Sequence, residues 1–313
     1  MNLTRLLPHQ DDKIYLTDGG LETTMIFDKN IDLPHFAACE LLHTEEGCQH
    51  LHEYYSEYAK VAVETKSNFI IESPTWRANP SWGKLLGYDD QMLLDLNHRA
   101  IAICKDIRDT YQTENTRMLI SGCMGSHGDG YNPEDGMTAE EAKNFHSMQI
   151  GILKAAGVDF VSAFTMAYVE EAVGLALAAR LHNIPVVISF TVETDGKLPT
   201  GMSLRDAIEQ VDRITENYVS YYMINCAHPS HFDFVLNDSE AWVSRISSLR
   251  ANASCKSHEE LDESTELDEG CPDDLAKQTH SLFNKFNQIN VLGGCCGTSV
   301  KHIRAMQVAC DTH

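Results

Sequence analysis

Residues Val158–Val192 have the sequence VDFVSAFTMAYVEEAVGLALAARLHNIPVVISFTV. The two ends, Val158–Thr165 and Pro185–Val192, are apolar throughout, as expected for parallel strands that are covered on both faces. Between them, Glu170–Leu181 has the length and apolar content of a helix. The segment therefore predicts a strand–helix–strand unit with two parallel strands.

The same pattern recurs along the rest of the chain. Helix-like stretches, among them Ala139–Ala156 and Leu204–Tyr218, separate further apolar runs. Eight strands that alternate with helices favour a closed barrel over an open sheet, so we predict an α/β fold, a single-domain (β/α)8 or TIM barrel over residues 1–313. The other six predicted strands are Ile14–Gly20, Asn68–Pro74, Met118–Gly125, Tyr221–Cys226, a weaker run near Trp242–Leu249, and Asn290–Cys295.

The charge balance limits the partners that we expect. Lysine and arginine total 24 against 46 aspartates and glutamates, which gives a net charge of −22. Nucleic acids and anionic lipids are bound by clustered lysine and arginine, so the sequence predicts no nucleic-acid partner and no membrane. No run reaches about 18 apolar residues and the start does not resemble a secretory signal. We therefore expect a cytoplasmic protein whose ten cysteines are reduced or bound to metal.

One acidic segment interrupts the alternation of strands and helices. Residues Glu259–Asp274 read EELDESTELDEGCPDD and hold nine acids in sixteen positions. We expect a solvated insertion between strands seven and eight. The alternative is a regulatory or partner-binding segment.

Cysteines at two strand ends give the strongest chemical signal. Gly293–Thr298 reads GGCCGT, and Cys226 ends the strand two before it. Adjacent strand residues point to opposite faces, so Cys295 and Cys296 can share a site only where the flanking glycines let the backbone turn. Three thiolates at one barrel mouth suit zinc, with the fourth position open as catalysis requires.

Two alternatives stay open for this cluster. Cys295 and Cys296 could form a redox pair, although a disulfide between sequence neighbours is strained. His228 and His231 follow Cys226 as C-x-H-x-x-H, so they could ligate a metal or line a loop.

Three elements together resemble the homocysteine S-methyltransferase family: Asp18–Gly20, Asn225-Cys226 and Gly293–Thr298. The family includes betaine- and S-methylmethionine-dependent enzymes and the homocysteine domain of cobalamin-dependent methionine synthase. The similarity spans roughly Ile14 to Ala305. It implies a (β/α)8 barrel that moves a methyl group from a cationic donor to homocysteine and gives methionine.

The resemblance also implies roles for individual residues. Zinc would be held by Cys226, Cys295 and Cys296, and the amino-acid part of homocysteine would contact Asp18, Gly19 and Gly20. Zinc lowers the pKa of a bound thiol, and the excess negative charge of the site keeps its sulfur nucleophilic and attracts a cationic donor. Donors of the S-methylmethionine, S-adenosylmethionine or betaine type fit this chemistry. We also expect Asn225 to orient Cys226 or the substrate.

Aromatic residues after the second strand are candidates for the donor site. Trp76 and Trp82 could offer ring faces to a sulfonium or quaternary ammonium group, or they could pack under a loop. Relatives have an aromatic residue at about the place of Trp76.

The chain departs from the family at the end of the fourth strand. Relatives carry Cys-Glu-Thr there, and the glutamate holds the homocysteine ammonium, whereas this chain has Ala163, Phe164 and Thr165. Phenylalanine cannot accept a hydrogen bond from an ammonium. One hypothesis is that Glu72 supplies the missing carboxylate. A second is a different thiol or selenol acceptor whose carboxylate is gripped by Arg77, unless Arg77 is an exposed loop residue.

Some residues and the function itself have second interpretations. Asp18 could be only a turn-former before two glycines. Asn252, after the seventh strand, could line the site. The chain could also be a non-catalytic zinc- or thiol-binding protein, which a fourth protein ligand such as His228 would favour.

Overall fold

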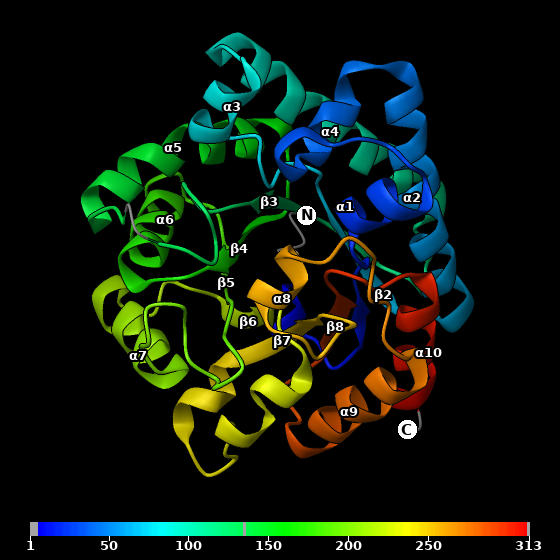
Figure 1. Cartoon of the computed structure of the whole chain (residues 1–313), viewed down its shortest axis with the longest axis vertical. Helices are drawn as coiled ribbons and strands as arrows, with labels where there is room; N and C mark the ends of the chain where they lie inside the picture. Colours follow the sequence, from blue (N-terminus) through cyan, green and yellow to red (C-terminus); the bar gives the residue numbers. More distant parts are fainter. Residues whose placement is uncertain (1–5, 134–135, 312–313) are drawn as a thin grey trace.

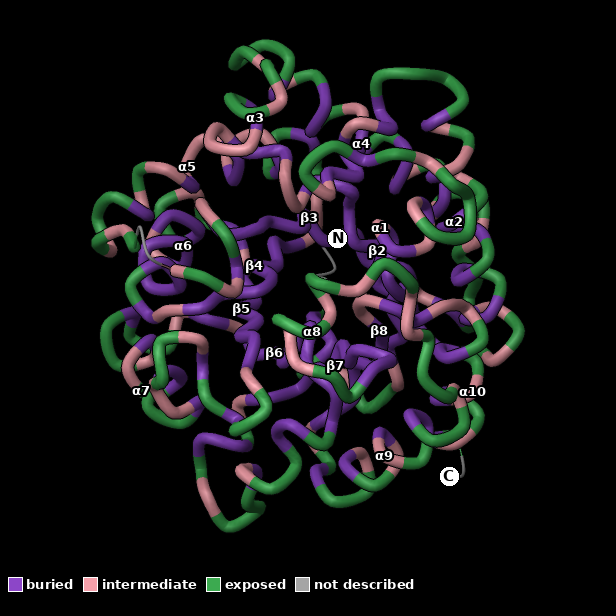
Figure 2. Tube along the Cα trace, viewed as in Figure 1, coloured by how far each residue is buried: buried purple, intermediate pink, exposed green. Residues whose placement is uncertain are grey.

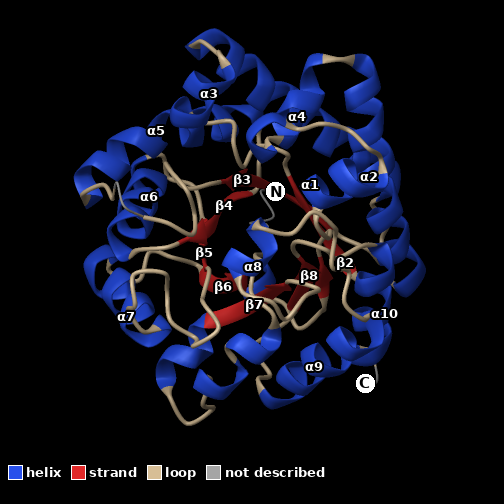
Figure 3. Cartoon of the chain, in the orientation of Figure 1, coloured by secondary structure: helices blue, strands red, loops and turns tan. Residues whose placement is uncertain are grey.

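A closed barrel of eight strands forms the centre of the molecule. The computed structural model describes residues 6–133 and 136–311. The strands pair in parallel and in chain order, and β1 closes the ring against β8. Helices surround this ring (Figure 1, Figure 3). The predicted (β/α)8 barrel is confirmed. The start of the chain, on which the expectation of no secretory signal rests, lies partly outside the described residues.

All eight predicted strands are present. The seventh begins later than expected because a 3-10 turn, Ala241–Arg245, precedes it. The first is shorter than predicted, since the chain from Asp18 onward forms the wall of a cavity. The strands are β1 Tyr15–Leu16, β2 Asn68–Glu72, β3 Met118–Met124, β4 Phe160–Met166, β5 Val186–Phe190, β6 Tyr221–Asn225, β7 Ile246–Ala251 and β8 Val291–Gly294.

The helices begin and end where the sequence supplies caps. The predicted helix Ala139–Ala156 is α5; Thr138 and Glu141 form a capping box at its start, and Gly157 ends it in the left-handed region. The helices are α1 Leu21–Thr23, α2 Glu45–Thr65, α3 Pro80–Leu86, α4 Asp90–Tyr111, α5 Ala139–Ala156, α6 Val169–Leu181, α7 Leu204–Thr215, α8 His258–Asp262, α9 Pro272–Lys285 and α10 Val300–Cys310.

Apolar side chains fill the space on both sides of the strand ring. Every residue of the eight strands is buried, which explains why the strand sequences do not alternate (Figure 2). One cluster fills the barrel interior and includes Tyr15, Phe160 and Phe164. The other packs between the strands and the surrounding helices. No helix in the described residues is long and apolar enough to span a membrane.

The acidic segment is exposed and is also attached to the barrel. The segment lies between β7 and β8, as expected, and its last three residues, 272–274, belong to α9. Its first residues belong to α8, which extends over the barrel mouth (Figure 1). The segment is tied to the barrel, because Asp268 accepts from the Ser254 hydroxyl and the Glu269 carbonyl lies 2.9 Å from His302 Nε2. Eight of its nine acidic residues are exposed, as expected for a solvated insertion, and the contacts with Ser254 and His302 attach this insertion to the barrel.

Candidate active site

A cavity of about 500 Å³ opens at the carboxyl ends of the strands. All ten residues predicted for the site line it: Asp18, Gly19, Gly20, Glu72, Trp76, Arg77, Asn225, Cys226, Cys295 and Cys296. We call the residues at or next to strand ends the inner wall: Asp18, Glu72, Phe164, Cys226, Arg250, Cys295 and Cys296. Those from loops, α1 and α8 are the outer wall: Glu22, Trp76, Arg77, Asp129, Tyr131, His258, Leu261, Asp262, Glu266 and Asp268.

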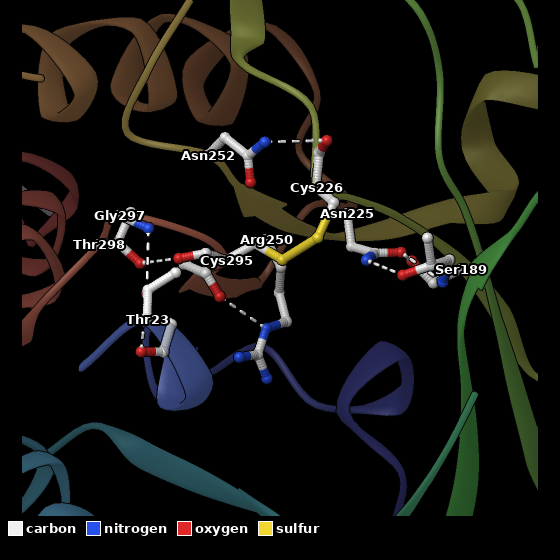
Figure 4. Close-up of a disulfide and its surroundings, with 12 residues drawn as sticks. Thr23, Ser189, Asn225, Cys226, Arg250, Asn252, Cys295, Gly297 and Thr298 are labelled. Carbon is white, nitrogen blue, oxygen red and sulfur yellow. Dashed lines mark hydrogen bonds between the residues drawn. A yellow bond between two sulfur atoms is a disulfide. The ribbon is translucent and has the colours of Figure 1, made fainter. Parts of the chain in front are cut away.

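The three cysteines of the inner wall lie together. Their sulfur atoms are all within 4.8 Å of one another. Cys226 and Cys295 are joined as a disulfide (Figure 4), whereas Cys296 is a free thiol. The expectation of reduced thiols therefore does not hold for this pair. The redox alternative for Cys295 and Cys296 is also wrong here, because the bond joins residues 69 positions apart.

Backbone hydrogen bonds gather the cysteines from two strand ends. Cys226 follows β6 with φ of 54°, so the chain turns out of the strand at this residue. Its N–H donates to the Arg250 carbonyl (3.1 Å), and its carbonyl accepts from the Asn252 side chain (3.0 Å). The Cys295 N–H donates to the Ala251 carbonyl (2.8 Å). Asn252 therefore lines the site and positions Cys226.

Asn225 ties β6 to the two strands before it. Its side-chain oxygen accepts from the Thr165 N–H (2.9 Å) and from the Ser189 hydroxyl, and its amide donates to Thr165 Oγ1 (2.9 Å). Thr165 has φ of 60°, where the β4–β5 register shifts. Figure 4 shows Asn225 directly before the disulfide. Its amide is committed to the protein, which supports a role in orienting Cys226.

The cluster has the chemistry of a metal site. Three thiolates are soft ligands that suit zinc once the cysteines are reduced. Burial raises the pKa of the Cys296 thiol to about 12, so a bound cation is needed to keep this sulfur anionic at neutral pH. His228 instead contacts Ser230, and His231 Nε2 lies 2.9 Å from the Cys255 carbonyl. Among the described residues, the candidate ligand group contains cysteines alone.

A buried ion pair, missed by the sequence analysis, crosses the inner wall. Arg250 Nη2 lies 2.8 Å from Asp18 Oδ1, and both side chains are buried. The Tyr54 hydroxyl donates to Asp18 Oδ2 (3.2 Å). Burial raises the pKa of Asp18, although Arg250 acts against this shift. The Asp18 carboxylate is therefore held by protein groups. Arg250 could have been found in the sequence, because it is the only charged residue in the otherwise uncharged strand β7.

Glu72 and Phe164 occupy the inner wall close to Arg250. The Phe164 ring centre lies 5.1 Å from the Arg250 guanidinium carbon. Glu72 is buried, and its Oε2 has no hydrogen-bond partner in residues 6–133 and 136–311. Burial raises the pKa of Glu72 to about 7, although Arg250 acts to lower it. The structure thus places a carboxylate in the cavity where Phe164 offers none.

Arg77 fills the space between the two tryptophans. Its guanidinium carbon lies 4.0 Å from the Trp76 ring centre and 3.4 Å from that of Trp82. Its Nη1 donates to the Gly128 carbonyl (3.5 Å). The interpretation of Arg77 as an exposed loop residue is wrong, because it is half-buried. One face of each tryptophan is already occupied by an internal cation.

The outer wall is strongly acidic and is closed by α8. It carries Glu22, Asp129, Asp262, Glu266 and Asp268, against the single guanidinium of Arg77. Burial raises the pKa of Glu22 to about 7. In α8, His258 Nε2 donates to the Cys226 carbonyl (2.6 Å), and the ring lies 4.1 Å from that of Tyr131. His258 therefore couples the outer wall to a cysteine of the inner wall.

Comparison with known proteins agrees with this arrangement. The family model described as homocysteine S-methyltransferase matches residues 15–310. Homocysteine S-methyltransferase 1 of Zea mays is 24% identical and is covered over 92% of both chains. Selenocysteine Se-methyltransferase of Brassica oleracea var. italica is 23% identical, over 93% of this chain and 87% of the relative.

The fold is also shared with solved structures. The homocysteine methyltransferase MmuM from Escherichia coli, in its metallated form, superposes with a TM-score of 0.76 at 16% identity, covering 98% of this chain and 99% of that one. Its oxidized form gives the same TM-score at 19% identity, with the same coverage. The family model covers nearly the whole chain. The chain therefore belongs to the homocysteine S-methyltransferase family.

Proposed function

We propose that this chain is a zinc-dependent S-methyltransferase that transfers a methyl group from a cationic donor to homocysteine and gives methionine. The observation that carries the proposal is the group of three cysteine sulfurs, within 4.8 Å of one another, in the wall of the cavity at the barrel mouth. Family membership supports the reaction class, and the metallated form of MmuM supports a metal at such a site.

Cys226, Cys295 and Cys296 would hold the metal after reduction of the Cys226–Cys295 disulfide. Zinc at this position would lower the pKa of the acceptor thiol and so supply an anionic sulfur at neutral pH. Asn225 and Asn252 keep the Cys226 backbone in place for this role. Because three protein ligands leave one tetrahedral position open, the site suits catalysis better than closed structural binding.

The transfer itself is an in-line displacement. The acceptor sulfur forms a bond to the methyl carbon as the bond from that carbon to the donor's sulfur or nitrogen breaks, and the donor's sulfur or nitrogen keeps the electron pair and becomes neutral. The walls contribute by holding both reactants in line and by excluding water. The carboxylates of the outer wall favour a positively charged donor of the S-methylmethionine, S-adenosylmethionine or betaine type.

A second acceptor class is favoured by Phe164, which stands where the family resemblance implies a glutamate for the homocysteine ammonium. Two relatives, from Brassica oleracea and Astragalus bisulcatus, are named selenocysteine methyltransferases. The same cavity would then methylate a selenol or another thiol. The remaining hypothesis is a protein that binds zinc or thiols without catalysis. A fourth protein ligand such as His228 would favour it, but the candidate ligand group in the described residues contains only the three cysteines.

The test is product formation by the reduced, zinc-loaded chain. Homocysteine is incubated separately with S-methylmethionine, S-adenosylmethionine and betaine, and methionine is measured by mass spectrometry. We expect methionine with one of these donors. Methylselenocysteine formed from selenocysteine, without methionine from homocysteine, would replace homocysteine as the acceptor. If zinc is bound and neither acceptor is methylated, the proposal is wrong.

A further inference from the structure

Three charged atoms of the inner wall are buried without hydrogen-bond partners among the described residues: Arg250 Nη1, Glu72 Oε2 and Asp18 Oδ1. Asp18 Oδ1 forms the ion pair with Arg250 Nη2, so Arg250 Nη1 and Glu72 Oε2 are the two that lack any partner in the described part of the chain. Both side chains line the same cavity as the three cysteines. A buried charged group that lacks a partner costs stability, so such atoms often mark the place of a ligand. Here a cationic donor atom and an anionic acceptor atom are available at one site.

The Arg250 guanidinium is held in a fixed orientation by its other nitrogens. Nε donates to the Gly294 carbonyl (2.9 Å), and Nη2 donates to the Gly19 carbonyl (3.2 Å) and pairs with Asp18. The group therefore cannot turn without breaking several contacts. Because Arg250 is paired with Asn225 and Gly293 on its neighbouring strands, its side chain originates beside the strand ends that carry the cysteines.

The two unpartnered atoms, Arg250 Nη1 and Glu72 Oε2, fit a ligand with both an anionic and a cationic group better than a ligand with only one of them. Asp18 and Arg250 neutralise each other. Glu72 then offers a carboxylate oxygen, and Arg250 Nη1 offers donors that suit a ligand carboxylate. A ligand with an ammonium and a carboxylate on one carbon satisfies both groups at once, whereas a thiol with only one of them leaves a buried group unpaired.

We propose that Arg250 binds the carboxylate of the acceptor and that Glu72 binds its ammonium. This inference rests on the proposed function and assigns the two residues that would select the acceptor at the same site. It assigns Arg250 a role in specificity, and it explains how the site holds an amino acid although Phe164 cannot bind an ammonium. Homocysteine and a selenol amino acid both meet the requirement.

The experiment compares three acceptors that differ by one group each. Homocysteine carries both groups, 3-aminopropane-1-thiol lacks the carboxylate, and 4-sulfanylbutanoate lacks the ammonium. For the wild type, we expect kcat/KM to fall about 100-fold when either group is removed. In Arg250→Lys, the penalty for removing the carboxylate should fall to about 10-fold or less, since lysine lacks the fixed fork. In Glu72→Gln, the penalty for removing the ammonium should fall instead.

The ratio between two acceptors is measured within one protein preparation, so partial misfolding of a variant cancels. Arg304→Lys, at an exposed surface arginine, is the matched control, and Arg77→Lys tests the other arginine that lines the cavity. Both variants should keep the wild-type ratio of kcat/KM between homocysteine and each of the two truncated thiols. The proposal would be overturned if removing the acceptor's carboxylate lowered kcat/KM as much in Arg250→Lys as in the wild type. It would also be overturned if this effect became smaller only in Arg77→Lys.

Calorimetric binding of the same three thiols to the reduced, zinc-loaded chain separates this inference from the proposed function. If no donor supports transfer but thiol binding still depends on Arg250 and Glu72 as above, the acceptor assignment holds and the reaction is wrong. If homocysteine is methylated but no ratio depends on Arg250, the reaction holds and the inference fails. If neither homocysteine nor selenocysteine binds, both fail.

Discussion

The inner and outer walls of the cavity are built in different ways. The inner wall consists of strand ends whose backbone groups bond to one another, as where Cys226 and Cys295 donate to the residues of β7. The outer wall comes from loops and the five-residue helix α8, and side-chain contacts such as that of His258 hold it in place. Figure 2 shows the same contrast, with buried strands beneath a partly exposed α8.

This difference separates the two reactants of the proposed reaction. The inner wall holds the groups that would fix the acceptor sulfur and its amino-acid part, where small displacements matter for an in-line transfer. The outer wall offers acidic side chains that attract a cation with little fixed geometry. We therefore expect changes in the inner wall to have larger effects than changes in the outer wall.

The largest effect should follow loss of one inner-wall sulfur. Cys296→Ser removes one of three candidate ligands, so zinc content should fall from about one ion per chain to below about one tenth, and methyl transfer should fall to background. Metal analysis of the reduced protein measures this. Cys271→Ser, an exposed cysteine at the start of α9, is the control and should keep its zinc. Full zinc retention in Cys296→Ser would show that Cys296 is not a ligand.

Glu72→Gln should change how stability depends on pH. Because the pKa of Glu72 rises from 4.5 to about 7 on folding, the folded wild type keeps a proton that the unfolded chain loses between these values. Wild-type stability should therefore fall as the pH rises through this window. The variant lacks this loss, so its free energy of unfolding relative to wild type should rise by up to about 3 kcal/mol from pH 4 to pH 8.

Urea unfolding at several pH values measures the effect of Glu72→Gln. The control is Glu64→Gln, which removes an exposed surface pair with Arg304 and should give a small difference that varies little with pH. Parallel stability curves for Glu72→Gln and the wild type would show that folding does not raise the pKa of Glu72.

Gly20→Ala tests how closely the inner wall is packed. An added Cβ would lie 2.7 Å from the Cys295 carbonyl oxygen and would also meet Thr23 Oγ1, so the cysteine backbone must shift. We expect a loss of about 1–3 kcal/mol of stability together with weaker zinc binding. Gly128→Ala is the control, because a Cβ there meets no atom within 4 Å. Equal zinc affinity in both variants would contradict the contrast between the walls.

The inner wall was predictable from sequence to the extent that motifs mark strand ends. Continuous apolar runs indicated the barrel, and the GGCCGT stretch with Cys226 indicated the thiol cluster. Arg250 was missed because its pairing with Asp18 depends on barrel closure, which brings residues 232 positions apart into contact. The place of α8 was not predicted, because the acidic composition of residues 259–274 indicated only exposure to solvent, whereas His258, just before them, anchors α8 over the mouth.

The smallest effect should follow release of α8 by His258→Ala. This change removes the hydrogen bond to the Cys226 carbonyl, the contact of Nδ1 with Glu193 Oε1 (3.1 Å) and the ring contact with Tyr131, which together should cost about 1–2 kcal/mol of local stability. Hydrogen exchange over residues 258–268 should therefore speed up about tenfold, with zinc content unchanged and the donor KM raised. Glu259→Ala, at an exposed position on α8, should change neither the rate of hydrogen exchange nor the donor KM. If exchange accelerates but the donor KM stays as in the wild type, the donor does not bind under α8. If zinc is lost as well, the two walls are not independent.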